Sequence, residues 1–148
     1  MVQYIDQEVI PLDRTKLWKF LDLHLDNQAI VEIHPDIVGQ SVLSSRGDET
    51  TVERQIRFLG STRRSVWRIT YTRPDRARWE ILESKGPLAQ GSYLENQYTD
   101  APGGGTLVQS EGDIRVTTFP GFMQRGVVNG AMSTIGKQDH AYLRVHPM

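Results

Sequence analysis

Six strand-like segments follow one another in the middle of the chain, separated by short connections rich in turn-forming residues. Pro74 and Asp75 form one such turn signal, because proline presets the first central dihedral angle and aspartate tolerates the second. Consecutive strands joined by short loops form hairpins, so these segments predict an antiparallel meander. The predicted strands are Val38–Ser45, Thr51–Leu59, Ser65–Thr72, Arg78–Glu83, Gly91–Tyr98 and Thr106–Val116.

One further strand and several helices are predicted on either side of this meander. Val2–Ile10 is rich in β-forming residues and predicts a first strand, whereas leucine and tryptophan at helical spacing predict a helix over Arg14–Leu23. His24–Glu32 predicts a second short helix. After Phe119–Gly121, apolar residues recur at helical spacing and predict one long C-terminal helix. This order predicts an α+β fold in which a curved antiparallel sheet of about seven strands wraps around the long helix, with two short helices after the first strand.

The length and the charge of the chain indicate the number of domains and exclude one class of partner. A length of 148 residues fits a single domain that spans residues 1–148. Lys and Arg number 17 and Asp and Glu number 18, which gives a formal net charge of -1. Electrostatic binding of nucleic acid needs a positive excess or a basic stripe, so no nucleic-acid partner is predicted. The arginines between Arg63 and Arg78 are interpreted as a solvated face of one hairpin.

The residue types that are missing also exclude several kinds of site. The chain has no cysteine, which excludes disulfides, thiolate metal sites and a cysteine nucleophile. No secretory leader opens the sequence, and no apolar run approaches the roughly 18 residues of a membrane span. We therefore expect a cytoplasmic protein that does not insert into membranes.

Three features of the sequence resemble the START-like superfamily, which is also called SRPBCC or the birch-pollen-allergen-like helix-grip fold. Pro11–Trp18 is similar to the strand-to-helix start of that family, and Gly103–Val108 is similar to its Gly-Gly-Thr entry to the last strand. The amphipathic C-terminal helix is the third feature, and the resemblance in the order of the elements covers essentially the whole chain. None of them is a catalytic signature.

The resemblance implies an apolar cavity between the sheet and the long helix. Members of the superfamily bind lipids, sterols, quinones, polyketides and other hydrophobic molecules. Some members, including the polyketide cyclase/dehydrase-like branch, cyclise or dehydrate polyketides. Fold alone does not determine function, so these activities are expectations only.

Arg54 is a charged residue on an otherwise apolar strand face. Alternation places it on the same face as Val52, Ile56 and Phe58. A buried arginine is costly unless an anion meets it, which favours a role in binding a ligand. The alternative is that Arg54 lies near the strand end and extends its head group to water.

Aromatic residues alternate along the next strands and are candidates for the wall of a cavity. Trp67 and Tyr71 share a face of one strand, and Trp79 follows after the turn. Their N–H and O–H groups would supply the few polar contacts that a ligand pocket needs. Tyr93 and Tyr98 lie on opposite faces of their strand, so at most one of them lines the cavity. Plain core packing is the alternative for each of these residues.

The final helix is predicted to close the cavity through Met123 and Val127, with methionine adapting to the shape of the ligand. Gly126, Gly130 and Gly136 lie in the same helix, where each costs about 1 kcal/mol relative to alanine. Either the helix backbone lies close against the sheet, or the missing side chains leave volume beneath the helix. The predicted ligand-binding residues are Arg54, Trp67, Tyr71, Trp79, Tyr93, Met123 and Val127.

Histidine and aspartate residues near the second predicted helix are of types that bind metal ions. His24 and His34 lie close in sequence to Asp22, Asp26 and Asp36. Their spacing matches no ligand motif with a mechanistic basis. No metal and no cofactor is predicted.

The sequence as a whole predicts binding of a small hydrophobic ligand, such as a lipid, a polyketide or an isoprenoid-like molecule, between the sheet and the C-terminal helix. One alternative is a metal-free polyketide cyclase or dehydratase, in which Arg54 and Glu95 would act as a positioned acid and base. Another is a co-chaperone-like interaction module with a closed interior and an apolar surface patch. A homodimer is possible through an exposed edge strand.

Overall fold

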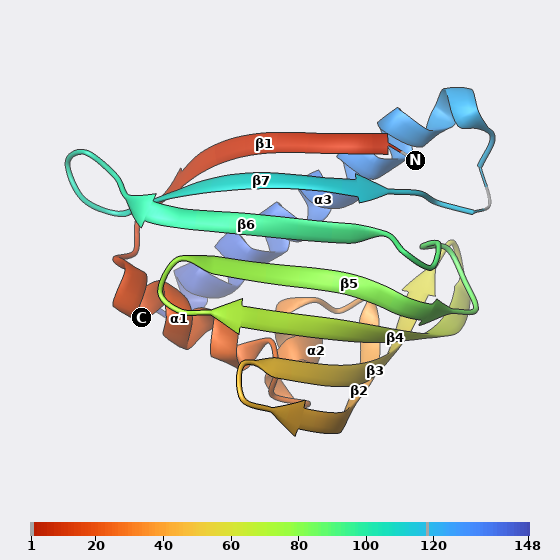
Figure 1. Cartoon of the computed structure of the whole chain (residues 1–148), viewed down its shortest axis with the longest axis horizontal. Coiled ribbons are helices and arrows are strands. Elements are labelled where there is room, and N and C mark those ends of the chain that lie inside the picture. The colour runs from red at the N-terminus through yellow and green to blue at the C-terminus, as the bar shows by residue number, and fades with distance from the viewer. Residues whose placement is uncertain (1, 118) are drawn as a thin grey trace.

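The computed structural model describes residues 2–117 and 119–148 as one antiparallel sheet with two short helices and a long C-terminal helix (Figure 1). The seven strands lie in the order β1-β7-β6-β5-β4-β3-β2, so neighbours from β2 to β7 also follow one another along the chain. The predicted α+β architecture is confirmed. The strands are β1 (Val2–Ile10), β2 (Ile37–Arg46), β3 (Glu49–Phe58), β4 (Ser61–Thr72), β5 (Arg76–Ser84), β6 (Tyr93–Asp100) and β7 (Thr106–Ile114).

Most strand boundaries agree with the predictions within a few residues, and the largest difference lies at the start of β4. This strand begins at Ser61, where the sequence predicts Ser65, because a tight turn continues the pairing with β3 up to Phe58 and Ser61. The two turn residues, Leu59 and Gly60, have φ angles of 50° and 79°. Positive φ at both central positions is the conformation that matches the twist of a two-residue hairpin.

The sheet divides between β5 and β6. These two strands pair over only part of their length, and on β5 the paired residues are Arg76–Glu80. Beyond that point the connecting segment 85–92 enters the gap, and Leu88 forms an isolated bridge with Val116, which follows β7. The predicted last strand is therefore shorter than expected and ends at Ile114.

Helices α1 (Arg14–Leu23) and α2 (Ala29–Ile33) follow β1, as predicted. The Asp13 carboxylate accepts a hydrogen bond from the Lys16 amide at 2.9 Å and caps α1. The second helix is shorter than the predicted His24–Glu32, because the residues between α1 and Ala29 form turns instead of helix. Asp26 then accepts the Ala29 amide at 2.8 Å, and α2 begins there.

The long helix α3 (Gly121–Val145) crosses the concave side of the sheet, with its first turns near the start of β1 and its last turns near α1 (Figure 1). Two separate apolar clusters hold it. The first cluster joins α1 and the sheet to Tyr142 and Leu143, and the second joins the far end of the sheet to Val128. The middle of α3 therefore lies between the two clusters.

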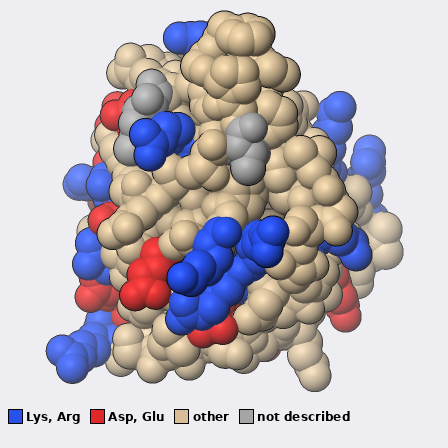
Figure 2. All heavy atoms as spheres, turned by 90° about the vertical axis from the view of Figure 1, so that its right-hand side faces the viewer, with Lys and Arg blue, Asp and Glu red and all other residues tan. Residues whose placement is uncertain are grey.

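The convex face of the sheet carries several of the predicted solvated arginines, beside carboxylates. Arg64 lies 3.0 Å from Glu53, and Arg68 lies 3.0 Å from Glu80. Figure 2, which views the molecule from the right-hand side of Figure 1, shows Lys and Arg side chains at the lower centre and along both edges, with Asp and Glu side chains beside several of them. Exposed pairs of this kind contribute little to stability, but they neutralise one another locally. In the described part of the chain, no helix is long and apolar enough to cross a membrane.

Candidate functional site

The inner face of the sheet holds four of the predicted ligand-binding residues. Trp67 is paired with Val52, which is fully buried, and Trp79 is paired with the buried Ile69. Paired residues of an antiparallel sheet share a face, so both tryptophans point toward α3. Arg54 and Tyr71 lie on the same face by alternation and are buried. The structure brings these four residues together.

Arg54 is only 5% exposed, so it does not extend to water from a strand end. Its Nε donates to Gln40 Oε1 at 2.7 Å, and one terminal nitrogen reaches the main-chain oxygen of His24 at 3.5 Å. The guanidinium lies 5.0 Å from the centre of the Trp67 ring. Among the described residues no carboxylate forms an ion pair with it, and burial lowers the pKa of Arg54 to about 10.

The aromatic residues of the inner face divide into a packed group and an accessible group. The Tyr71 hydroxyl donates to the Leu21 main-chain oxygen at 2.7 Å, and burial raises the pKa of this tyrosine. Tyr71 therefore belongs to the closed core beneath α1. Trp67 and Trp79 are only partly buried, and the Trp67 indole donates to the Ser65 hydroxyl at 2.8 Å. These two rings are available to contact a ligand.

Tyr93 lies on the convex face, opposite to the predicted cavity. It is paired with Glu80, and its ring lies 4.1 Å from the Arg78 guanidinium. Tyr98 is the tyrosine of this strand that points inward, as the opposite faces of the two residues require. Glu95 also lies on the convex side, within 3.7 Å of Arg78. The acid–base pair of Arg54 and Glu95 weighed from the sequence is therefore wrong, since the sheet separates them.

The burial of the sheet-facing residues of α3 is uneven along the helix. Val128, Ile135 and Tyr142 are seven residues apart and lie on one line along the helix. Val128 is 1% exposed and Tyr142 is partly buried, whereas Ile135 between them is 41% exposed. A sheet-facing isoleucine with this exposure is only partly covered by other side chains.

The other predicted residues of α3 do not lie on this line. Met123 is 40% exposed and lies far around the helix from the line of Val128. Val127 packs in the second apolar cluster. Gly126 and Gly130 are exposed on the outer side of the helix, and a Cβ atom at either of them would touch nothing within 4 Å. Close approach of the helix backbone to the sheet therefore does not explain these glycines.

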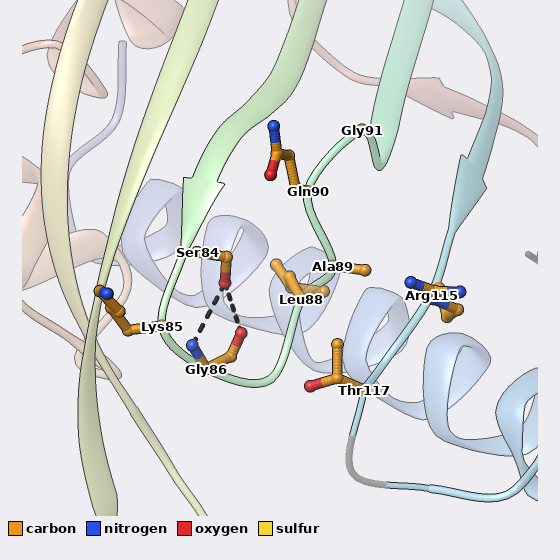
Figure 3. A pocket seen from close by; sticks show the side chains of 9 residues that line it. All are labelled: Ser84, Lys85, Gly86, Leu88, Ala89, Gln90, Gly91, Arg115 and Thr117. Carbon is orange, nitrogen blue, oxygen red and sulfur yellow. Dashed lines mark hydrogen bonds between the residues drawn. The ribbon is translucent and has the colours of Figure 1, made fainter.

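Two hollows in the surface lie elsewhere, and none of the seven predicted residues lines either of them. The larger, of about 610 Å³, occupies the gap where β5 leaves β6 (Figure 3). At its edge the Gly86 amide donates a hydrogen bond to the Ser84 hydroxyl, and Arg115 and Thr117 lie on the opposite side. The other hollow, of about 410 Å³, lies between α1 and Pro74. Both are open to solvent and neither lies between the inner face and α3.

Two histidines and an aspartate meet at the C-terminal half of α3. His24 Nε2 lies 3.3 Å from Asp139 Oδ1, and His34 Nε2 lies 3.0 Å from the same oxygen. Burial opposes ionisation of Asp139, but hydrogen bonds and charge from the two histidines outweigh it and lower its pKa to about 2. Both histidines were weighed as metal ligands from the sequence, together with nearby aspartates. Two of those aspartates make other contacts, since Asp22 forms an ion pair with Arg73 and Asp26 caps α2.

No protein-family model and no curated protein matches the sequence. Solved structures do match it in shape. A START superfamily protein from Mycobacterium smegmatis superposes with a TM-score of 0.77 at 12% identity, covering 97% of this chain and 98% of that chain. The chain has the START-like helix-grip fold. The fold expected from Pro11–Trp18, Gly103–Val108 and the C-terminal helix is thus confirmed.

Two further structures with the helix-grip fold represent different kinds of protein. Ara h 8.0201 superposes with a TM-score of 0.71 at 13% identity, covering 97% of this chain and 98% of that chain. The Zhui aromatase/cyclase from Streptomyces sp. R1128 superposes with a TM-score of 0.69 at 12% identity, covering 97% of this chain and 95% of that chain. Identities this low concern the fold alone, so function has to be argued from the site.

Proposed function

We propose that this protein binds a small hydrophobic molecule with an acidic head group between the inner face of the sheet and α3. The observation that supports it is the exposure of Ile135, at 41%, on the sheet-facing line of a helix whose other residues on that line are buried or partly buried. Trp67 and Trp79 are likewise only partly buried on the inner face. An apolar ligand would cover these side chains and gain about 25 cal/mol for each Å² of apolar surface removed from water.

Arg54 supplies the polar contact in this proposal. It is a buried cation beside Trp67 that meets no carboxylate of the described residues. A carboxylate or similar anion on the ligand would offset the cost of burying this charge. The acid–base pair weighed for cyclisation does not form part of this proposal, because Glu95 is on the convex face of the sheet.

Replacing Ile135 with tryptophan tests whether a ligand occupies the space beneath α3. The larger side chain fills that space, so Ile135→Trp should weaken binding of decanoate at least tenfold, or about 1.4 kcal/mol. Isothermal titration calorimetry measures the affinity. Val145→Trp is the matched control, since Val145 lies on the same helix and is 74% exposed. Equal affinities in wild type and Ile135→Trp would contradict the proposed position of the ligand.

Replacing Arg54 with glutamine tests the acidic head group. Hydrogen bonds to charged groups contribute about 1.5–3 kcal/mol, so Arg54→Gln should weaken decanoate binding by roughly 10–100-fold. Decanol, which has the same chain and no charge, should bind to both proteins with similar affinity. If both ligands lose affinity to the same degree, Arg54 acts only on the structure of the inner face.

Assembly through the edges of the sheet stays a prediction. The edge strands β1 and β2 carry exposed aliphatic side chains, among them Ile5, Val9 and Leu43. Exposed edge strands can pair with a second chain, which is the basis on which a homodimer is proposed. Sedimentation of the purified chain over a range of concentrations measures whether this occurs.

A further inference from the structure

The histidine–aspartate cluster (His24, His34 and Asp139) joins three parts of the chain that the fold brings to one point. His24 is the C-terminal cap of α1, and His34 is the C-terminal cap of α2. Asp139 lies on α3, 115 residues beyond His24. Both histidines are buried, and the carboxylate of Asp139 is the more accessible part of the cluster, with its side chain 30% exposed.

The hydrogen bonds on the outer side of the two imidazole rings decide which nitrogen of each neutral ring carries the proton. His24 Nδ1 lies 3.0 Å from the Phe20 main-chain oxygen, which can only accept, so Nδ1 carries a proton. His34 Nδ1 likewise donates to Gln138 Oε1 at 2.8 Å. In the neutral rings both Nε2 atoms are then lone-pair acceptors, and both point at the same oxygen of Asp139.

Three acceptors that converge on one point need either protons on the rings or a metal ion between them. A proton on one ring satisfies only one of the two contacts with Asp139, and the second nitrogen still opposes the carboxylate. Protons on both rings satisfy both contacts, but they place like charges on two rings whose centres are only 5.4 Å apart. One divalent ion bound to both nitrogens and the carboxylate satisfies all three acceptors at once.

The two nitrogen–oxygen distances in the cluster are close to those around such an ion. Zinc–nitrogen and zinc–oxygen bonds of about 2.0–2.1 Å place neighbouring ligand atoms of a tetrahedron about 3.3–3.4 Å apart. The two nitrogen–oxygen distances are 3.3 Å and 3.0 Å, and the three ligand atoms all lie within 4.8 Å of one another. The hydrogen bonds from Nδ1 to Phe20 and Gln138 are the outer contacts that orient imidazole ligands in metal sites.

We propose that His24, His34 and Asp139 bind one divalent transition-metal ion through both Nε2 atoms and a carboxylate oxygen. Two imidazoles and one carboxylate are a donor set for ions such as zinc(II), cobalt(II) or iron(II), whereas magnesium and calcium favour oxygen ligands alone. Three protein ligands leave at least one coordination position free, as in catalytic rather than structural sites. Ile135 lies one helical turn from Asp139, so this position borders the space under α3. The metal site does not depend on the proposed hydrophobic ligand.

Titration of chelator-treated protein with Zn²⁺ tests the site. Isothermal titration calorimetry should give a single saturable site per chain, and Asp139→Asn and His34→Gln should each weaken it at least about tenfold. His140→Gln is the matched control, because it removes the histidine next to Asp139 that lies toward Glu8 instead. Circular dichroism confirms that each variant remains folded. Equal Zn²⁺ affinity in the control and in both cluster variants would overturn the proposal.

Nitrogen-15 NMR of the histidine side chains provides a test that needs no variant. On addition of Zn²⁺ to the wild-type protein, the Nε2 resonances of His24 and His34 should shift, while those of His140 and His146 stay unchanged. Zn²⁺ that shifts only the exposed histidines, or a folded wild type with no saturable binding, would overturn the site. Either result leaves the binding of decanoate untouched, so failure of this proposal is distinguishable from failure of the proposed function.

Discussion

Trp18→Ala should lower the free energy of unfolding by about 3–5 kcal/mol, the range for truncating a buried aromatic residue. Trp18 is 6% exposed and lies at the junction of α1 with the sheet. Its ring makes edge-to-face contacts with Tyr71 and Tyr98, at centroid distances of 5.2 Å and 5.5 Å. The indole also donates to the Pro74 main-chain oxygen at 2.9 Å. Truncation leaves a cavity and removes this hydrogen bond, and urea unfolding followed by circular dichroism measures the loss.

Two further variants separate the causes of that effect. Trp18→Phe keeps most of the ring but loses the hydrogen bond to Pro74, so its destabilisation should be the smaller of the two. Lys19→Ala changes the exposed neighbour on the same helix and should stay within about 0.5 kcal/mol of wild type. A loss below about 1 kcal/mol in Trp18→Ala would mean that α1 is not anchored to the sheet through this residue.

The order of strands and helices could be predicted from the sequence because its signals are local. The Pro74–Asp75 turn and the alternation of Trp67, Ile69 and Tyr71 each depend on neighbouring residues only. The same alternation placed Arg54 correctly on the inner face. Alternation also showed that Tyr93 and Tyr98 lie on opposite faces of their strand, but it did not show which of the two faces points toward α3. That choice depends on where α3 packs, and alternation along a strand carries no such information.

The parts of the site on α3 could not be predicted in the same way. The apolar spacing predicted a helix, but not which side of it would face the sheet. Met123 was therefore assigned to the cavity, and Ile135, which belongs to the same apolar pattern, was not singled out. The histidine–aspartate cluster depends on contacts across 115 residues of chain. Asp22, Asp26 and Asp36 were considered because they are close to the histidines in sequence, but their spacing matched no motif, and no local pattern pointed to Asp139.

Gln124→Leu should lower the free energy of unfolding by about 2–4 kcal/mol, because leucine keeps the size of the side chain but leaves buried polar groups unpaired. Gln124 is 8% exposed in the first turn of α3. Its Oε1 accepts the Val116 amide at 2.8 Å, and its Nε2 donates to the main-chain oxygens of Val116 and Phe119, the latter at 2.6 Å. The side chain thus connects the beginning of α3 to the segment after β7. Urea unfolding measures the effect, and Arg125→Leu at the exposed neighbour is the control.

Hydrogen exchange shows whether the loss is confined to that end of the helix. The amide of Val116 loses its acceptor in Gln124→Leu, so its exchange should accelerate together with that of the first turns of α3. Tyr142 and Leu143 pack in the first apolar cluster, so the last turns should remain protected. Uniform acceleration along the whole helix would contradict separate anchoring of its two ends. Separate anchoring is what the position of Ile135 requires, because a helix held at both ends can leave its middle accessible to a ligand.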